Sequence, residues 1–332
     1  MLKVVIDRDI PFIEGLFEPY ARVAAVEGRS ISPSDVADAD ALVVRTRTRC
    51  NASLLEGSKV RTIVTATIGT DHIDTAWCRR NGIDVFNAAG CNARGVLQWV
   101  SAVLAHTLKI KGLNPSQLTL GVIGAGNVGS LVIEYARLWG FNVLVCDPPR
   151  EEREHCGFIS AEEVFRRADI VTLHVPLDAS TFHLVDSRML GLAGGRIMLI
   201  NSSRGEVVDS EALIRSQAEF AVDVWENEPD IDLRIVRRAV IATPHIAGYS
   251  LQGKANASAR VAEVLAERCG FPLAGWYPAG IQRTVPHPVG WQEMCSSIAS
   301  YFDAEAESSY FKSHPREFEA LRNNYRYRLE YF

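Results

Sequence analysis

The sequence predicts an α/β fold in which a doubly wound domain is inserted into a second α/β domain, with a small extra element at the C-terminus. Short runs rich in Val and Ile recur along the chain with helix-length segments between them, which is typical of parallel sheets. The runs fall into two series, and a helical pattern lies at each junction between them. We therefore expect two parallel sheets built from segments that are not contiguous in the sequence.

Each series of apolar runs predicts the strands of one sheet. The first series comprises Lys3–Asp7, Ala41–Thr46, Arg61–Thr67 and Ile83–Ala88. The second series comprises Leu118–Ile123, Asn142–Cys146, Asp169–His174, Arg196–Asn201, Phe220–Val224 and Val240–Ala242. Six strands in the second series is the number of a Rossmann-type sheet.

Two helical patterns mark the places where the chain passes between domains. Arg94–Lys109 is long and mostly apolar, which suits a buried helix, and Lys254–Arg268 carries apolar residues at helical spacing. After Gly270 several Pro and Gly residues interrupt the pattern, and a polar, aromatic-rich tail follows over Tyr301–Phe332. This tail is either a surface appendage or an oligomerisation arm.

Composition excludes several classes of protein. Hydrophobic residues make up 47% and charged residues 23% of the 332 positions, as in ordinary globular proteins. The formal net charge of −5 provides no uniform basic field for nucleic acid, and no run of about 18 apolar residues occurs that would span a membrane. The seven cysteines form no CxxC pair, so neither a disulfide framework nor a metal site is indicated. We expect a cytoplasmic protein with no metal, nucleic-acid or membrane partner.

A glycine-rich turn follows the first strand of the second series. The sequence GAGNVG, residues 124–129, comes directly after LTLGVI and opens an apolar-periodic helix. Gly124 permits the tight turn, Gly126 lets a pyrophosphate approach the backbone, and Gly129 lets helix and strand pack closely. The phosphates would face the positive end of the helix dipole, so the turn predicts a dinucleotide site.

Asp147 ends the next strand, at the spacing where a carboxylate accepts hydrogen bonds from the adenosine ribose. The same carboxylate would repel a 2′-phosphate, which favours NAD over NADP. Arg150 lies three residues further on, but Pro148 and Pro149 are expected to turn it away from the cofactor.

These observations give a complete domain organisation. We expect a Rossmann-type, doubly wound NAD-binding domain over residues 94–245, inserted in a flavodoxin-like α/β substrate-binding domain. Residues 1–93 and 246–269 would form the substrate-binding domain, and residues 270–332 the C-terminal element.

Three polar residues follow the last three strands of the second series. Arg204 follows RIMLINSS, Glu228 follows AVDVWEN and His245 follows VIATP, and ligands collect beyond the carboxyl ends of parallel strands. Arg204 can bind the carboxylate of a 2-hydroxy acid through two hydrogen bonds, while His245 takes the hydroxyl proton as hydride leaves C2. Glu228 would favour the protonated imidazole, which should move the pH optimum of oxidation upward.

Other side chains compete for these roles. Asp209, Asp178 and His183 are the alternative acid–base candidates. We expect His174 to be structural and Cys91 to be a small buried thiol without special reactivity.

Several blocks resemble those of the D-isomer-specific 2-hydroxyacid dehydrogenases. ATIGTDHID, GVIGAGNVG, INSSRGEVVD, DVWENEP and TPHIAG occur in that family's order, and the resemblance covers nearly the whole chain. Within this family, the chain most resembles the enzymes that act in vitamin B6 synthesis. The blocks that carry this resemblance are VRTRTRCN, ATIGTDHIDTAWC, AAGCNARG, CDPPR, PHIAGYSLQGKA and HPREFEALRNNYRYRLEYF. The resemblance implies NAD-dependent oxidation of 4-phospho-D-erythronate at C2, giving 2-oxo-3-hydroxy-4-phosphobutanoate.

The resemblance also implies roles for individual residues. It assigns catalysis to Arg204, Glu228 and His245 and substrate contacts to Thr46, Thr67 and Tyr249. The NAD contacts that it implies, together with those of the glycine turn, are Gly124, Gly126, Asn127, Val128, Gly129, Asp147, Val175, Asp223 and Gly248. Two departures from the pattern are a shortened stretch between Asp209 and Phe220, and Ser202-Ser203 where Ala-Cys is more common.

Arg45, Arg47 and Arg49 alternate in the sequence VVRTRTR. Alternate residues of an extended segment project to one side, so these arginines could share a substrate phosphate, and we predict phosphate contacts at Arg45 and Arg47. A solvated charge run is the alternative. Two rival functions share most of these features: a dehydrogenase of glycerate or phosphoglycerate, and a non-catalytic NAD-sensing regulator, against which the complete catalytic set argues.

Large apolar side chains crowd the C-terminal tail. Within Arg316–Leu329, the residues Phe318, Leu321, Tyr325 and Leu329 recur at three- and four-residue steps and would form one stripe on a helix. The stripe could cover the chain's own first domain, but the resemblance implies a homodimer in which two such arms pack together. A further hypothesis is that one tail arginine reaches the partner's active site and binds the substrate phosphate, the candidates being Arg322, Arg326 and Arg328.

Overall fold

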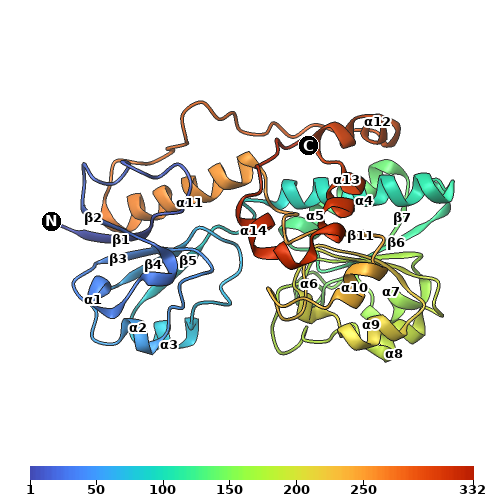
Figure 1. Ribbon diagram of the computed structural model, residues 1–332, viewed down its shortest axis with the longest axis horizontal. Helices are drawn as coiled ribbons and strands as arrows, with labels where there is room; N and C mark the ends of the chain where they lie inside the picture. The colour runs from blue at the N-terminus through green and yellow to red at the C-terminus, as the bar shows by residue number, and fades with distance from the viewer. The chain divides into compact units, whose positions relative to one another are not determined.

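The computed structural model describes residues 1–332 and divides the chain into two compact units (Figure 1). The first unit comprises residues 1–92 and 251–283, and the second comprises residues 93–250 and 284–332. Residues 270–332, which were expected to form a separate C-terminal element, are divided between the two units. The bulk of the tail therefore belongs to the unit that carries the glycine turn.

The first unit contains a parallel five-stranded sheet in the order β2-β1-β3-β4-β5, which is the predicted flavodoxin-like order. Its strands are β1 (Lys3–Asp7), β2 (Arg22–Val26), β3 (Ala41–Val44), β4 (Thr62–Thr65) and β5 (Asp84–Asn87). Its helices are α1 (Pro33–Val36), α2 (Ala52–Leu55), α3 (Thr75–Arg80) and α11 (Leu251–Cys269), with a 3₁₀ turn at Gly28–Ser30. Strand β2 was not predicted.

Alternate strand residues of this sheet enter two different cores. Val4 and Ile6 pack with Leu265 of α11 on one face, while Val5 packs with Leu55 of α2 on the other. Because both faces are covered, the central strands β3 and β4 are buried at every residue rather than at alternate ones.

The second unit contains a parallel six-stranded sheet in the order β11-β10-β9-β8-β6-β7. Its strands are β6 (Thr119–Ile123), β7 (Asn142–Cys146), β8 (Ile170–Leu173), β9 (Met198–Asn201), β10 (Glu219–Val222) and β11 (Ile241–Ala242). The strand order reverses at β6, which pairs with β7 on one side and β8 on the other. Ligands of doubly wound sheets bind at such a switch point, and the glycine turn follows β6 directly.

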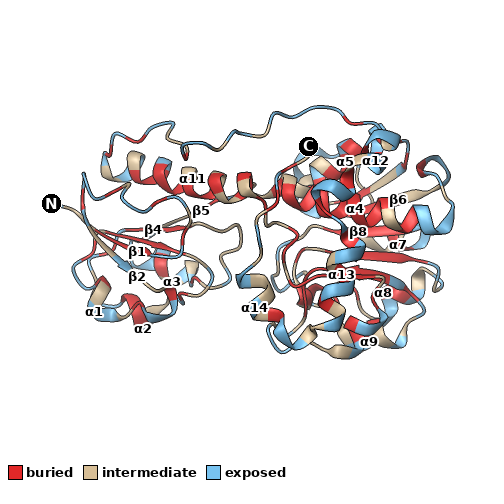
Figure 2. Ribbon diagram, turned by 45° about the horizontal axis from the view of Figure 1, so that its top comes forward, coloured by how far each residue is buried: buried red, intermediate tan, exposed pale blue.

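Helices cover both faces of the six-stranded sheet, and its strands are buried between them (Figure 2). Helices α4 (Ala93–Lys111) and α5 (Asn127–Trp139) share one core with the sheet. The opposite core includes residues of α7 (Ala161–Arg167), α8 (Ser187–Leu192), α9 (Ser210–Arg215) and α10 (Leu233–Arg238). The remaining short elements are α6 (Pro148–Glu154) and the 3₁₀ turns Pro115–Gln117 and Gly205–Val207.

The shortened stretch after Asp209 folds into the six-residue helix α9, and Arg238 of α10 binds its open end. The Arg238 guanidinium donates hydrogen bonds to the carbonyl oxygens of Leu213, Ile214, Ser216 and Ala218. A helix end leaves its last carbonyls without intrahelical partners, so one guanidinium supplies here the donors that a longer helix would have provided.

The tail of the chain packs onto its own second unit. It forms α12 (Trp291–Tyr301), α13 (Ala304–Ser313), a 3₁₀ turn at Pro315–Glu317 and α14 (Phe318–Asn323). The expected helical stripe up to Leu329 is wrong, because α14 ends at Asn323 and Leu329 is 54% exposed. Three phenylalanine rings of the tail are buried within the chain instead, since Phe311, Phe318 and Phe332 are each at most 2% exposed. No helix is long and apolar enough to cross a membrane.

Candidate active site

Arg204, Glu228 and His245 all come from the carboxyl edge of the six-stranded sheet. They follow β9, β10 and β11, which are consecutive neighbours in the strand order. Because these strands are parallel neighbours, the loops that follow them lie along the same edge of the sheet. A site can therefore be assembled there from segments that are distant in the sequence.

His245 and Glu228 form a hydrogen-bonded pair. Nδ1 of His245 lies 2.7 Å from Oε2 and 2.9 Å from Oε1 of Glu228, and Trp225 N–H donates to Oε1 at 3.0 Å. Burial raises the pKa of the Glu228 carboxyl, but the charge and hydrogen bond of His245 and the charge of Arg322 outweigh burial and leave that pKa below its ordinary value. An ionised carboxylate that accepts a hydrogen bond from Nδ1–H leaves Nε2 of the ring available for chemistry.

The loop that carries His245 is held by Asp223. Oδ1 of Asp223 accepts hydrogen bonds from Thr243 Oγ1 at 2.6 Å and Ile246 N at 2.8 Å, and Oδ2 accepts one from Ala247 N at 2.8 Å. His245 itself has φ +58°, a conformation that L-residues rarely adopt and that the flanking hydrogen bonds stabilise. Asp223 was predicted as an NAD contact, and its fully buried carboxylate organises the catalytic loop from within.

Gly205 brings the Arg204 loop against the Glu228 loop. A Cβ placed on Gly205 would lie 1.9 Å from the carbonyl carbon of Trp225 and 2.2 Å from Glu226 N. Only glycine permits this backbone approach. The preceding residue Arg204 donates from Nη1 to the Ser203 carbonyl at 2.8 Å, and its own carbonyl accepts a hydrogen bond from Asn201 Nδ2 at 2.9 Å.

The glycine turn has the shape that a dinucleotide requires. Gly124 has φ +90°, and a Cβ there would lie 2.6 Å from the carbonyl oxygen of His174 and 2.9 Å from a methyl carbon of Val175. A Cβ on Gly129 would lie 1.9 Å from the Gly124 carbonyl oxygen, so the turn and α5 are in backbone contact. A Cβ on Gly126, in contrast, would meet nothing within 4 Å. This space lies at the N-terminus of α5, where a pyrophosphate would bind.

Asp147 closes the other side of the glycine turn. Its Oδ2 accepts a hydrogen bond from Ala125 N at 2.7 Å, and its Oδ1 accepts one from Arg150 N at 2.9 Å. The expectation that Arg150 turns elsewhere is wrong: Nη1 of Arg150 donates to the Ala125 carbonyl at 2.9 Å, and Nε donates to Glu154 at 2.7 Å. Arg150 folds back because Pro148 and Pro149 begin α6 and place Arg150 in its first turn.

The competing acid–base candidates have other partners. Asp209 caps α9 by accepting a hydrogen bond from Ala212 N, and Asp178 accepts hydrogen bonds from the turn that follows it. Burial lowers the pKa of His174 to about 3, which keeps that ring neutral, and the ring contacts Thr172 at 3.0 Å. His183 pairs with Glu226 at 2.9 Å, and Cys91 is half-buried and belongs to no disulfide.

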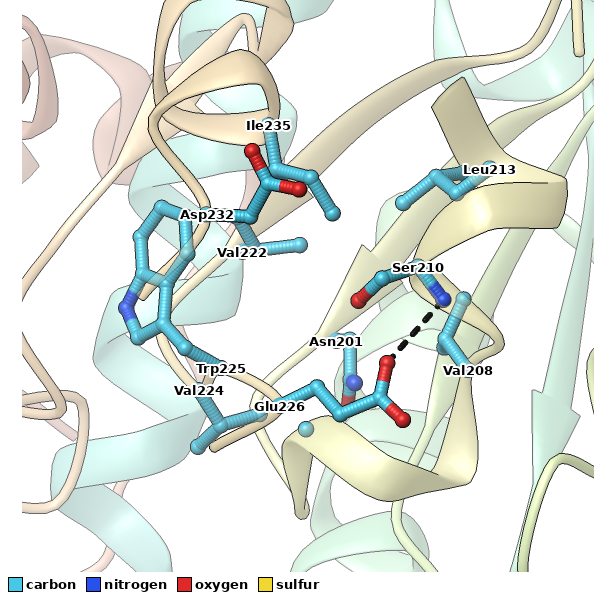
Figure 3. Close-up of a pocket in the computed structure, with 11 residues that line it drawn as sticks. Asn201, Val208, Ser210, Leu213, Val222, Val224, Trp225, Glu226, Asp232 and Ile235 are labelled. Carbon is cyan, nitrogen blue, oxygen red and sulfur yellow. Dashed lines mark hydrogen bonds between the residues drawn. The ribbon is translucent and has the colours of Figure 1, made fainter. Parts of the chain in front are cut away.

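Glu226 lies two residues before Glu228 and serves a different purpose. Its carboxylate accepts a hydrogen bond from Ser210 N at 3.3 Å at the side of a small internal cavity (Figure 3). The cavity measures about 20 Å³, enough for a water molecule but not for a hydroxy acid. Glu226 thus connects the loop after β10 to the start of α9.

The predicted substrate residues of the first unit have distinct surroundings. Arg45 forms ion pairs with Asp7 at 3.0 Å and Asp9 at 2.9 Å. Arg47 instead lines a concavity of about 300 Å³ together with Arg29 and Arg49. The premise that residues 45–49 are extended is wrong, because the chain turns there and Thr48 N donates to the Arg45 carbonyl.

Thr46 and Thr67 lie just beyond the carboxyl ends of adjacent strands, β3 and β4. Thr46 belongs to the turn that follows β3. The Thr67 hydroxyl lies 2.6 Å from the Thr65 hydroxyl and donates to the Gly69 carbonyl at 3.1 Å.

Comparison with known proteins agrees with this geometry. Residues 92–247 match the NAD binding domain of the D-isomer specific 2-hydroxyacid dehydrogenases. The chain is 42% identical to an erythronate-4-phosphate dehydrogenase of Bacteroides fragilis, over 99% of this chain and 97% of the relative. The chain belongs to the D-isomer-specific 2-hydroxyacid dehydrogenase family.

Two further proteins are similar to this chain over most of their length. An erythronate-4-phosphate dehydrogenase of Bacteroides thetaiotaomicron is 39% identical, with 99% of this chain and 97% of the relative covered. A crystal structure of NAD+-bound 3-phosphoglycerate dehydrogenase from Entamoeba histolytica superposes with a TM-score of 0.67 and 25% identity, covering 85% of this chain and 99% of that one. The α/β fold and the NAD-binding domain predicted from the sequence are thereby confirmed.

One of Arg322, Arg326 and Arg328 was expected to reach a partner subunit, and two of these three candidates, Arg322 and Arg328, make contacts within their own chain. Arg322 donates to the Tyr249 hydroxyl at 3.2 Å and to Glu228 at 3.3 Å. Arg328 is buried and donates to the carbonyls of Ile246 at 2.9 Å and Gly95 at 2.9 Å. These contacts within the chain could not be predicted, because the partner residues are far from the tail in the sequence and no periodicity relates them to it.

Proposed function

We propose that the protein catalyses the NAD-dependent oxidation of 4-phospho-D-erythronate at C2, giving 2-oxo-3-hydroxy-4-phosphobutanoate. The observation that carries this proposal is the hydrogen bond between His245 and Glu228, on a sheet whose glycine turn fits a dinucleotide. The substrate follows from the similarity over nearly the entire chain to enzymes named for erythronate 4-phosphate.

Each catalytic side chain has one task in this reaction. Nε2 of His245 removes the C2 hydroxyl proton, while Glu228 fixes the ring tautomer through Nδ1 and stabilises the imidazolium that forms. Arg204 binds the substrate carboxylate and the oxygen that becomes the carbonyl, since a guanidinium offers two parallel donors. Bound NAD supplies the acceptor for the hydride that leaves C2.

The residues that would hold NAD are those of the glycine turn and the neighbouring strand ends. Gly126 leaves room for the pyrophosphate, Asn127 and Val128 begin α5, and Gly124 and Gly129 maintain the turn. Asp147 would accept hydrogen bonds from the ribose. The additional proposed contacts are Val175, Asp223 and Gly248.

We assign the substrate phosphate to Arg47 in preference to Arg45. Two carboxylates already neutralise Arg45, one of them the buried Asp7, whereas Arg47 lines the concavity that also contains Arg29 and Arg49. A phosphate dianion is well matched by several guanidinium groups. Thr46, Thr67 and Tyr249 complete the proposed set of substrate contacts.

The proposal is tested by mixing purified protein with NAD and 4-phospho-D-erythronate and following NADH absorbance, with D-glycerate and 3-phosphoglycerate as competing substrates. We expect kcat/KM to be highest for 4-phospho-D-erythronate. His245→Gln should lose about 10² to 10⁴ in kcat, the range for a missing general base, and retain NAD binding measured by calorimetry. Binding of NAD without turnover of any of the three acids would instead identify a regulator, and preference for another acid would reject the substrate.

Two further features belong to the same proposal. We infer a cytoplasmic homodimer, supported by the family resemblance and by three tail side chains that stay exposed, Tyr301, Tyr310 and Leu329. Light scattering of the full chain should give twice the 36.6 kDa of one chain. A monomeric mass at micromolar concentration would reject the dimer.

A further inference from the structure

Arg322 joins two loops of the active site. Its Nη1 donates to Glu228 Oε2 at 3.3 Å, and its Nε donates to the Tyr249 hydroxyl at 3.2 Å. Its side chain is only 24% exposed, and that of Glu228 is 19% exposed. One guanidinium of the tail therefore contacts both the acid that pairs with the proposed base and a proposed substrate residue.

The tail holds Arg322 in place on both sides. Before it, the Phe311 ring packs against Phe318 and against Trp225 of the Glu228 loop, with ring centres 6.1 and 5.6 Å apart. After it, Arg328 binds carbonyls of the His245 loop, and Glu330 accepts a hydrogen bond from Ser250 Oγ at 2.7 Å. These anchors make Arg322 a fixed part of the site rather than a mobile surface side chain.

Glu228 Oε2 is shared between two nitrogen donors, because it lies 2.7 Å from His245 Nδ1 and 3.3 Å from Arg322 Nη1. Two further titratable groups face Glu228, His245 and Arg322. They are the buried Asp223 carboxyl and the Tyr249 phenol. A carboxylate alone strongly favours the imidazolium, and an imidazole in that form cannot accept the substrate proton. A guanidinium on the same oxygen weakens this preference.

We propose that Arg322 is a positioning residue that balances the charge of Glu228, so that His245 stays available as a base, and that orients Tyr249 toward the substrate. This proposal rests on the proposed function for its catalytic meaning. Burial lowers the pKa of Arg322, but Tyr249 and Glu228 outweigh burial and leave that pKa above its ordinary value, so the guanidinium stays charged.

The decisive experiment is an NMR titration of ¹³C-labelled histidine in the substrate-free protein, with the His245 signal assigned by its loss in His245→Gln. In Arg322→Gln we expect the ring to titrate about one pH unit higher than in the unmodified chain. Arg322→Lys keeps the charge and should titrate close to the unmodified chain. Arg316→Gln, an exposed change in the same tail, is the control and should not alter the titration.

Kinetics test the second part of the proposal. In Arg322→Gln the acid limb of kcat/KM for oxidation should move to higher pH by the amount seen in the titration, and KM should rise because Tyr249 loses its donor. In Arg322→Lys only the KM should rise. An unchanged His245 titration in Arg322→Gln overturns the proposal, and Arg322→Met, which is also uncharged, gives the same test if the Gln variant does not fold. Because the titration contains no substrate, its outcome is independent of whether 4-phospho-D-erythronate is the substrate.

Discussion

The carbonyl carbon of Trp225 lies only 1.9 Å from the position that a Cβ of residue 205 would occupy. Gly205→Ala should therefore force the Arg204 and Glu228 loops apart, lowering the free energy of unfolding by about 3 kcal/mol and reducing kcat. Gly191→Ala in α8 is the matched control, since a Cβ there meets nothing within 4 Å and stability should stay level or rise by up to about 1 kcal/mol. Urea unfolding compares the two variants, and equal midpoints would refute the close packing.

The lowered pKa of Glu228 makes stability depend on pH in acid solution. A carboxyl whose pKa is lower in the folded chain contributes stability that is fully present above its ordinary value of 4.5 and is lost as pH falls through the folded value. The melting temperature of the unmodified chain should thus fall more steeply below about pH 5 than that of Glu228→Gln, which lacks this carboxyl. Calorimetry between about pH 6 and 3.5 measures both slopes, and parallel curves would contradict the assigned pairing.

Asp147→Ala should weaken the choice of NAD over NADP. The change removes a negative charge and ribose acceptors, and it leaves Arg150 beside the glycine turn, where its guanidinium can attract a 2′-phosphate. We expect the ratio of kcat/KM for NAD to that for NADP to fall by about tenfold or more, which corresponds to roughly 1.4 kcal/mol. Asp147→Ala with Arg150→Ala should recover part of the preference, and equal ratios in the single and double variants would exclude a role for Arg150.

Arg238→Met should destabilise the second unit by about 1 to 2 kcal/mol, because the carbonyls at the end of α9 lose their charged donor. Arg237→Met is the adjacent control, as this exposed arginine should contribute within about 0.5 kcal/mol. Thermal unfolding of the two variants is the measurement. A shared melting temperature would mean that the short helix needs no external cap.

The strands whose ends could be predicted have a continuous apolar centre between polar residues. β1 and β7 begin and end at the predicted residues, since a continuous apolar run between polar flanks leaves few alternatives. Strand β2 escaped prediction because its residues RVAAV are exposed or half-buried and centre on two alanines, which favour strands less than valine or isoleucine does. The position of β2 in the sheet is set by its backbone pairing with β1 more than by its own side chains.

The common location of the three proposed catalytic side chains at one edge of the sheet was predictable from the strands that precede them. Arg204, Glu228 and His245 each follow a recognisable strand, and the parallel sheet places strand ends together. Arg322 follows no strand, and its position depends on contacts between the tail and distant loops, which leave no local pattern in the sequence. The ion pairs of Arg45 could not be predicted either, since its acidic partners Asp7 and Asp9 lie at the end of another strand.

Arg328 binds the catalytic loop through carbonyl oxygens, and every amino acid supplies a carbonyl. The two sides of this contact therefore differ in their tolerance of mutation. The hydrogen bond does not depend on the Ile246 side chain, which is restricted instead by its burial in the core, whereas no other residue type offers the forked donor of Arg328. In a library of random variants, functional clones should retain arginine at position 328 and accept at position 246 only apolar residues of similar volume.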